Sequence, residues 1–322
     1  MSLRIGIIGC GGFARYRLGN LLRVKDIEVV ALVDPSSEQI ALMREQHEPV
    51  ALARDFARLE DVSAGSLDAV IINTPHSDHC DQICFAFQQG WHVLCEKPLV
   101  DTLDEFQAIC KARDAAGKIG MVSYQRHFDA MFRTIRQRIR DGHAGQISVL
   151  SAFLAQNWKQ LTMGSWRQDP SVSRGGMFHD SGSHMVDALL FCSGEVPKTV
   201  SGRFDSRGTK VEIDGSISFL TDNGALGTIS IAGAAAGWVE EITIVGELES
   251  YFVREGKLTI KDEAGRIVPF DLLDGSSPDE AFVHAIAKGG PNDAEFESAL
   301  GVIKLTEAAY LSHERGGQPV TI

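Results

Sequence analysis

The chain has 322 residues, more than one hydrophobic core usually organises, so two domains are expected. Hydrophobic residues make up 44% and charged residues 23%, which argues against a disordered, collagen-like or coiled-coil chain. The formal net charge of -12 would repel a phosphate backbone, so no nucleic-acid partner is expected.

Neither secretion nor membrane insertion is expected. The first residues lead into a predicted strand without a signal peptide's basic and apolar regions, and no apolar run reaches the roughly 18 residues of a membrane-spanning helix. Six cysteines lie mostly within apolar segments, which is typical of reduced thiols. We therefore expect a cytoplasmic protein, and the cysteine spacing predicts no metal site.

The first 122 residues alternate short β-branched runs with amphipathic stretches, which predicts βαβ units. The predicted strands are 4–9, 28–33, 68–73, 92–95 and 119–122. The predicted helices are 14–22, 36–46, 78–89 and 103–116, the last two ending at Gly90 and Gly117. The predicted fold class is α/β: residues 1–122 form a Rossmann domain, a doubly wound parallel sheet that binds NAD.

Residues 123–322 have a different pattern, which predicts an α+β domain on a mostly antiparallel sheet for substrate binding and oligomerisation. Predicted strands are 146–156, 199–204, 212–220, 225–232, 240–245 and 251–254, with hairpin-like turns at 221–224 and 254–257. Predicted helices are 128–140, 182–192, 279–288 and 295–315. An antiparallel sheet can bury its open face against another copy, so a homo-oligomer of unspecified order is expected.

A glycine-rich loop follows the first predicted strand and precedes a helix. From Gly9 it reads Gly-Cys-Gly-Gly-Phe-Ala, the form G-x-G-x-x-A. Such glycines permit a tight turn and let the N–H groups of the helix N-terminus approach a pyrophosphate. We assign cofactor binding to Gly9, Gly11, Gly12, Phe13 and Ala14. The alternative is a glycine turn that only packs the helix on the strand.

Asp34 ends the second predicted strand, where a carboxylate can accept hydrogen bonds from both adenosine ribose hydroxyls and would repel a 2′-phosphate. No basic residue stands among the next four positions, so the predicted cofactor is NAD, with acceptance of NADP left open. The alternative is that Asp34 caps the next helix with Ser36 and Ser37.

Two groups of residues have the chemistry that alcohol oxidation requires: a base for the hydroxyl proton and a charge for the developing alkoxide. Lys97 follows a buried strand between Glu96, a counter-charge, and Pro98, which fixes the backbone. Asp180 and His184 are four apart, so on a helix the carboxylate could orient the imidazole. The alternatives are a solvated lysine and an ordinary helix N-terminus.

The ordered motifs resemble those of the glucose-fructose oxidoreductase/inositol dehydrogenase family, also called Gfo/Idh/MocA. The resemblance spans nearly the whole chain: the glycine loop, Thr74-Pro75 with His79, Glu96-Lys97-Pro98, and Gly175-Gly176 followed by Asp180 and His184. It implies an NAD-dependent oxidoreductase in which Lys97 and His184 are the acid/base pair and Asp180 orients the substrate. Implied cofactor contacts are Asn73, Thr74, Pro75, His79, Glu96 and Lys97, and implied substrate contacts are Lys97, Arg126, Trp166, Arg167, His179, Asp180 and His184.

The expected substrate is a small molecule, a sugar, polyol, sugar acid or related secondary alcohol. Met177-Phe178-His179 is bulkier and more polar than the family's usual run, so no substrate identity is carried over. No metal is required, because Lys97 can supply the positive charge. Two alternatives stay open: redox-neutral elimination or hydrolysis of a sugar with regenerated NAD, and a non-catalytic NAD-binding regulatory protein.

Overall fold

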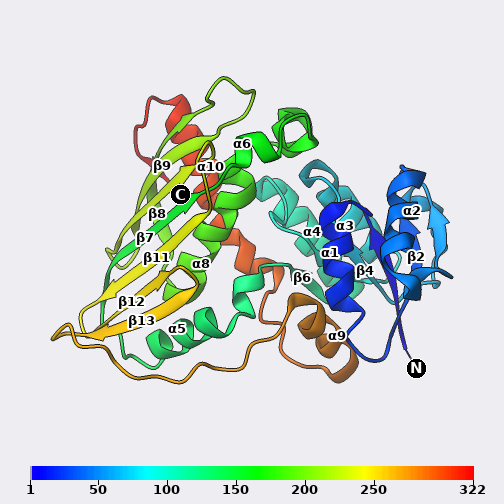
Figure 1. Cartoon of the computed structure of the whole chain (residues 1–322), viewed down its shortest axis with the longest axis horizontal. Coiled ribbons are helices and arrows are strands. Elements are labelled where there is room, and N and C mark those ends of the chain that lie inside the picture. The colour runs from blue at the N-terminus through cyan, green and yellow to red at the C-terminus, as the bar shows by residue number, and fades with distance from the viewer. Residues whose placement is uncertain (1) are drawn as a thin grey trace. The chain divides into compact units, whose positions relative to one another are not determined.

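The computed structural model describes residues 2–322, which form two compact units (Figure 1). The first unit extends to Tyr124 and also contains Ser276–Glu297; the second contains Gln125–Gly275 and Ser298–Ile322. The chain thus crosses two residues after the predicted boundary, and later returns. Helix α9 (Pro278–Lys288), which we had placed in the second domain, belongs to the first unit.

The first unit is built on a six-stranded parallel sheet in the order β3-β2-β1-β4-β5-β6, the strand order of a Rossmann fold. Its central strands are continuous apolar runs buried on both faces, as parallel sheets require. The strands are β1 (Leu3–Ile8), β2 (Ile27–Val33), β3 (Arg54–Phe56), β4 (Ala69–Ile72), β5 (His92–Cys95) and β6 (Gly120–Val122). The sequence missed β3, a three-residue edge strand with no buried residue.

Helices and short helical turns connect these strands, close to the predicted positions. They are α1 (Gly12–Leu21), α2 (Ser37–Gln46), α3 (His79–Gln88) and α4 (Leu103–Ala116), with turns η1 (Glu48–Val50), η2 (Leu59–Asp61) and η3 (His76–Asp78). A capping box between Thr102 and Glu105 starts α4, and Gly117 ends it with a φ of 61°.

The returning segment completes the edge of this sheet. The Val122 N–H donates to the carbonyl oxygen of Ala294 at 2.9 Å, and the Asn292 side chain donates to the carbonyl oxygen of Gly120 at 2.9 Å. The Phe296 ring fills the space that a side chain at Gly120 would need. The amphipathic pattern of the returning segment predicted helix α9 but carried no information about the domain on which this helix packs.

The second unit is built on an eight-stranded sheet in the order β13-β12-β11-β7-β10-β9-β8-β14, with strands coloured from green to yellow in Figure 1, apart from the C-terminal β14. Only β7 and β10 pair in parallel, which confirms the mostly antiparallel prediction. The strands are β7 (Ile147–Ala155), β8 (Pro197–Asp205), β9 (Asp214–Thr221), β10 (Leu226–Ala232), β11 (Val239–Gly246), β12 (Glu249–Arg254), β13 (Lys257–Asp262) and β14 (Val320–Thr321). Both predicted hairpin turns are present, with positive φ at Gly224, Glu255 and Gly256.

Helices α8 (Ser183–Ser193) and α10 (Leu300–Glu314) pack on one face of this sheet, and α5 (Ala130–Arg140) packs on α8. Shorter elements are η4 (Gln125–His127), α6 (Trp158–Leu161), η5 (Trp166–Gln168), α7 (Pro170–Ser173), the π-helical turn η6 (Phe178–Gly182) and η7 (Phe296–Ala299). Within residues 2–322, no helix is long and apolar enough to cross a membrane.

Candidate active site

The glycine loop links β1 to α1 with the geometry that a dinucleotide site needs. Gly9 has a φ of 82°, and a Cβ there would lie 3.0 Å from the backbone of Asn73 and Thr74. A Cβ on Gly11, in contrast, would meet nothing within 4 Å, so a pyrophosphate has space to approach. Among the described residues, no side chain caps α1 and no acidic residue stands in its first turn. The exposed N–H groups therefore suit an anion.

Asp34 ties the end of β2 to this loop. Its carboxylate accepts hydrogen bonds from the backbone N–H groups of Cys10 and Ser36, both at 2.8 Å. Ser36, not Asp34, is the N-cap of α2, which disfavours the capping alternative for Asp34. Each carboxylate oxygen keeps a lone pair that can accept from a ribose hydroxyl.

Sequence reasoning missed an arginine beside this position. Arg15, five residues after Cys10, donates from Nη1 to the Cys10 carbonyl at 2.8 Å and to Gln39 Oε1 at 2.6 Å. A guanidinium therefore lies between the glycine loop and α2. Cys10 itself is no nucleophile, because burial and then the charge of Asp34 raise the pKa of its thiol to about 12.

The loop after β4 carries Asn73, Thr74 and Pro75, and His79 begins α3. Asn73 Oδ1 is buried and has no hydrogen-bond partner in residues 2–322, as expected of an atom that meets a ligand. His79 is fully buried; Nε2 contacts the Thr74 carbonyl at 3.1 Å, and Nδ1 contacts the Pro98 carbonyl at 3.0 Å. His79 thus joins this loop to the one after β5, whereas we predicted a direct cofactor contact.

The loop after β5 carries Glu96 and Lys97, whose peptide bond to Pro98 is cis. We treated Glu96 as the counter-charge of Lys97, whereas the ion pair described for it is with Arg17 of α1, Oε1 to Nη1 at 2.5 Å. Arg17 Nε also donates to Asp279 of α9 at 2.8 Å. All three side chains are buried. This triad fixes the loop that presents Lys97 against the helix that follows the glycine loop.

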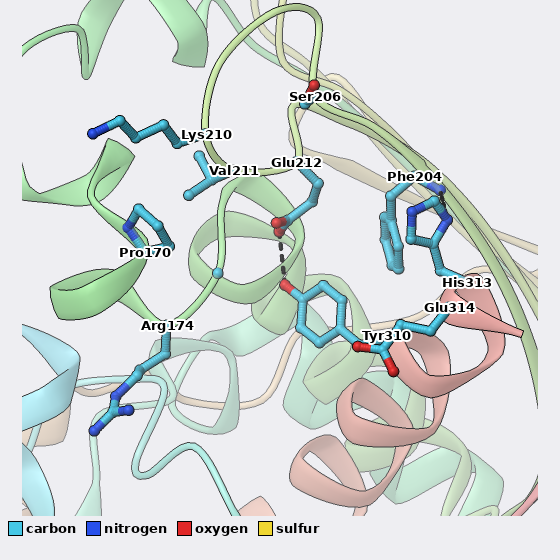
Figure 2. A pocket seen from close by; sticks show the side chains of 11 residues that line it. Pro170, Arg174, Phe204, Ser206, Lys210, Val211, Glu212, Tyr310, His313 and Glu314 are labelled. Atoms are coloured by element: carbon cyan, nitrogen blue, oxygen red, sulfur yellow. Dashed lines mark hydrogen bonds between the residues drawn. The ribbon is translucent and has the colours of Figure 1, made fainter.

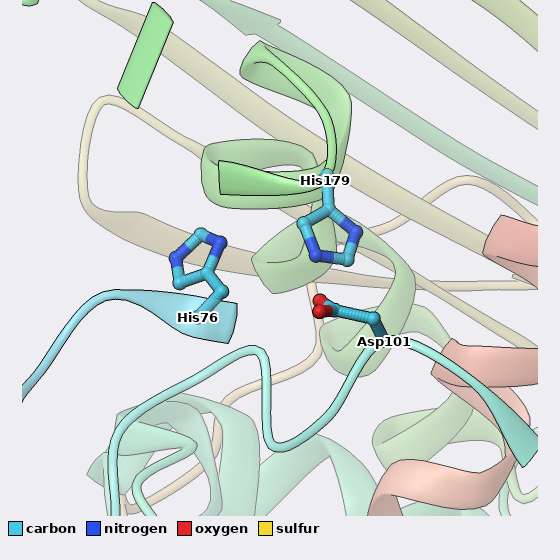
Figure 3. Close-up of side chains that lie close together, drawn as sticks. All are labelled: His76, Asp101 and His179. Carbon is cyan, nitrogen blue, oxygen red and sulfur yellow. The ribbon is translucent and has the colours of Figure 1, made fainter. Parts of the chain in front are cut away.

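Figure 3 shows two first-unit side chains that sequence reasoning did not select, His76 and Asp101. A ring nitrogen of His76 and a carboxylate oxygen of Asp101 lie within 4.8 Å of each other. They belong to the loops that also carry His79 and Lys97. The third labelled residue, His179, is a buried member of η6 in the second unit.

In the second unit, Asp180 of η6 is hydrogen-bonded to side chains from α6 and η5. Asp180 Oδ2 accepts hydrogen bonds from Trp158 Nε1 at 3.0 Å and from Arg167 Nε at 3.1 Å. The Arg167 guanidinium carbon lies 4.5 Å from the ring centroid of Trp166. Asp180 is therefore held in place by Trp158 and Arg167, and Arg167 in turn lies over the Trp166 ring.

We had assumed that Asp180 and His184 belong to one regular α-helix, but they do not. Residues Phe178–Gly182 form a π-turn, and His184 lies in the first turn of α8. A single π-turn at the start of a helix often marks a functional site. Farther along α8, Asp187 Oδ1 is 2.8 Å from His127 Nε2, and both are almost completely buried. This pair anchors α8 to η4.

Arg126, which the resemblance implies as a substrate contact, is buried. Its side chain is 8% exposed, and Nη2 lies 2.6 Å from both carboxylate oxygens of Glu240. A direct substrate contact, as we predicted for Arg126, would require this ion pair to rearrange.

Family models match both units. The model described as an oxidoreductase family with an NAD-binding Rossmann fold matches residues 3–124, and the GFO/IDH/MocA C-terminal domain matches residues 132–252. The chain belongs to the Gfo/Idh/MocA family of oxidoreductases. Its Rossmann domain is NAD-binding, and the predictions of fold and enzyme class are confirmed.

Relatives and solved structures agree with this assignment. The chain is 24% identical to the rhizopine catabolism protein MocA of Rhizobium meliloti, over 95% of this chain and 93% of that protein. It is also 24% identical to the D-glucoside 3-dehydrogenase of Escherichia coli (strain K12), over 74% of this chain and 69% of that protein.

Two solved structures share the fold over the whole chain. The WlbA dehydrogenase of Bordetella pertussis in complex with NADH and UDP-GlcNAcA has a TM-score of 0.85 at 23% identity, covering 100% of this chain and 99% of that chain. The aldose-aldose oxidoreductase of Caulobacter crescentus complexed with glycerol has a TM-score of 0.86 at 21% identity, covering 100% of both chains.

Proposed function

We propose that the protein is an NAD-dependent dehydrogenase that oxidises a secondary alcohol of a sugar, a polyol or a sugar acid. The observation that carries the proposal is the fixed carboxylate of Asp180, which Trp158 and Arg167 hold one turn before His184. In the same chain, the glycine loop and Asp34 fit NAD. The names of the relatives support a sugar-like substrate.

NAD, when bound, supplies the acceptor for the hydride. In the proposed mechanism the ammonium group of Lys97 stabilises the developing alkoxide, and an imidazole nitrogen of His184 takes up the hydroxyl proton. Asp180 accepts a hydrogen bond from a substrate hydroxyl and so orients the reacting carbon. Because Asp180 is already fixed, little reorganisation is needed when the substrate binds.

The position of Arg167 favours a substrate that carries an acidic group. Its side chain is 34% exposed, and within the described part of the chain it donates a side-chain hydrogen bond through Nε alone. Both Nη groups are thus available to a carboxylate, which a planar guanidinium can bind in bidentate fashion. We therefore place sugar acids first among the candidate substrates.

A substrate panel tests the function. Purified protein is incubated with NAD and neutral sugars, polyols and sugar acids, while NADH formation and substrate consumption are both measured. Stoichiometric NADH supports the dehydrogenase. Substrate loss without NADH would favour the redox-neutral alternative. NAD binding without any turnover across the panel would favour the regulatory protein, and the Lys97→Ala variant serves as the inactive control.

We also propose that a second copy covers the open face of the second sheet. Small hydroxyl side chains form a row across four strands there, since Ser151 is in register with Thr228 and Thr243, and Thr228 with Ser218. Beside this row Phe153 is 38% exposed. Sedimentation equilibrium should give an oligomer that Phe153→Arg dissociates, whereas Leu52→Arg, on an exposed side chain of the first unit, should not. A monomeric wild type contradicts this proposal.

For the compartment and for the class of partner we propose what the sequence predicts. All six cysteines are free thiols, which suits a reducing compartment, so we propose the cytoplasm. The net charge of -12 disfavours binding to nucleic acid. Fractionation of cells that express the chain and a mobility-shift assay with duplex DNA and RNA test the two statements.

A further inference from the structure

One carboxylate, that of Glu212, accepts hydrogen bonds from four donors at the start of η6. Its oxygens accept from the backbone N–H groups of Gly176 at 2.7 Å, Phe178 at 3.1 Å and His179 at 3.3 Å. The hydroxyl of Tyr310, from α10, donates to the same carboxylate at 2.7 Å (Figure 2). Glu212 also accepts from the Met177 N–H through its backbone carbonyl, at 3.0 Å.

The glycine pair before η6 is shaped around this arrangement. A Cβ at Gly176 would lie 2.0 Å from the backbone oxygen of Glu212, and a Cβ at Gly175 would lie 2.5 Å from the hydroxyl of Tyr310. The two glycines make room for Glu212 and Tyr310, so the motif and the two distant residues form one unit.

The charge of Glu212 suits its position. The first N–H groups of a helix have no partner within the helix and favour a negative charge. Side chains within the segment often supply that charge. Asp180 stands in the first turn of η6, but in the described chain no side chain of the segment caps its N-terminus. Glu212, more than thirty residues later, supplies it from the loop before β9. A π-turn is an uncommon backbone form, and this external support is what keeps it in place.

We propose that Glu212, held by Tyr310, is a positioning residue for the reaction. It fixes the π-turn that carries His179 and Asp180 and that leads into the helix of His184. This inference rests on the proposed dehydrogenase function. Glu212 and Tyr310 line an open pocket of about 410 Å³ (Figure 2). If the Tyr310 hydroxyl is removed, water can therefore reach the Glu212 carboxylate, and no sealed cavity forms.

Two substitutions test the proposal. Glu212→Gln removes the negative charge and replaces one of the two oxygens that accept from the Gly176 N–H by an NH2 group, which cannot accept. Tyr310→Phe removes one hydrogen bond. Displacing catalytic groups by about 1 Å can cost on the order of 10²-fold in rate. We expect kcat to fall on the order of 10²-fold in Glu212→Gln and about tenfold in Tyr310→Phe. The affinity for NAD should be unchanged in both.

The second unit offers a matched control. Glu249 and Tyr251 of β12 form another carboxylate–hydroxyl pair, at 2.9 Å, and Glu249 also binds Arg138. Glu249→Gln and Tyr251→Phe should lower Tm and leave kcat at the wild-type value. If both pairs only stabilise the unit, the two sets of variants will show equal changes in Tm and no change in kcat.

Hydrogen exchange gives a readout that needs no turnover. The amides of Gly176, Phe178 and His179 should exchange faster in Glu212→Gln, while those of α5 keep their wild-type rates. A wild type without activity on any substrate would count against the proposed function, and exchange would still decide the role of Glu212. If Glu212→Gln does not fold, Tyr310→Phe decides. Wild-type kcat and wild-type exchange in the folded variants would overturn the proposal.

Discussion

The buried triad of Arg17, Glu96 and Asp279 should make the first unit sensitive to a single substitution. Arg17 comes from α1, Glu96 from the loop before Lys97 and Asp279 from α9. Burial lowers the pKa of Arg17, but the charges of Asp279 and Glu96 outweigh it and leave the pKa raised. Arg17→Met keeps the apolar stem and leaves two carboxylates without their cation.

The expected loss follows from the burial of the three groups. Removing one partner of a buried ion pair costs about 3–5 kcal/mol, because an uncompensated charge stays behind. In a domain of about 150–250 residues each kcal/mol lowers Tm by about 2–4 °C, so we expect a decrease on the order of 10 °C. NAD should also bind more weakly, because α1 and the Lys97 loop lose their common anchor.

Thermal unfolding of wild type and variant, followed by calorimetry, measures this loss. The control is Arg4→Met, which breaks a pair with Asp68 at 2.8 Å whose side chains are 41% and 37% exposed. Exposed pairs contribute about 0–1 kcal/mol, so the control should lose at most a few degrees. Equal decreases in Tm for the two variants would refute the argument that burial makes this triad decisive.

Two further predictions concern the cofactor and the chemistry. NAD should bind more tightly than NADP in calorimetric titrations, because Asp34 would repel a 2′-phosphate. Equal or tighter NADP binding would instead point to Arg15, which reaches from the glycine loop to α2. Lys97→Ala and His184→Ala should each lower kcat/KM by about 10²–10⁴ while NAD affinity is retained. Near wild-type turnover in both variants would contradict the proposed acid/base roles.

Local patterns predicted most of the fold because they depend on neighbours in sequence. Periodicity and terminal glycines gave the helices, and α4 has the predicted bounds, Leu103–Ala116. The missed strands β3, β13 and β14 are short or lie at sheet edges, where alternate burial leaves little signal. The docking of α9 was missed because it depends on an ion pair between residues 262 positions apart.

The candidate site divides in the same way. The glycine loop and Asp34 form a local motif, and the structure places them together as expected. Glu212 could not be found from sequence, because its donors begin 36 positions earlier and nothing nearby marks it as a helix cap. A Glu at the start of the predicted strand 212–220 looks like a solvated side chain, and the Gly175-Gly176 pair does not show which residues lie against it.

His92, at the start of β5, makes the stability of the first unit depend on pH. Its Nδ1 accepts a hydrogen bond from the Ile119 N–H at 3.0 Å, which requires that nitrogen to be unprotonated. Burial, and then the charge of Lys118, lower the pKa of His92 from 6.5 to about 4. The unfolded chain therefore binds more protons than the folded protein between these values, so the stabilising contribution is complete above about pH 6.5 and is lost as pH falls toward 4.

A tenfold change in proton affinity corresponds to about 1.4 kcal/mol, so this difference amounts to about 3 kcal/mol without screening. Because the ring is only half-buried, solvent screening reduces the expected contribution to about 1–2 kcal/mol. His92→Asn retains an acceptor for the Ile119 N–H but cannot bind a proton. The free energy of unfolding, from urea titrations at neutral pH and at about pH 4.5, should therefore fall less in the variant than in wild type. If both proteins lose equal stability across this interval, His92 is not the group that links folding to pH.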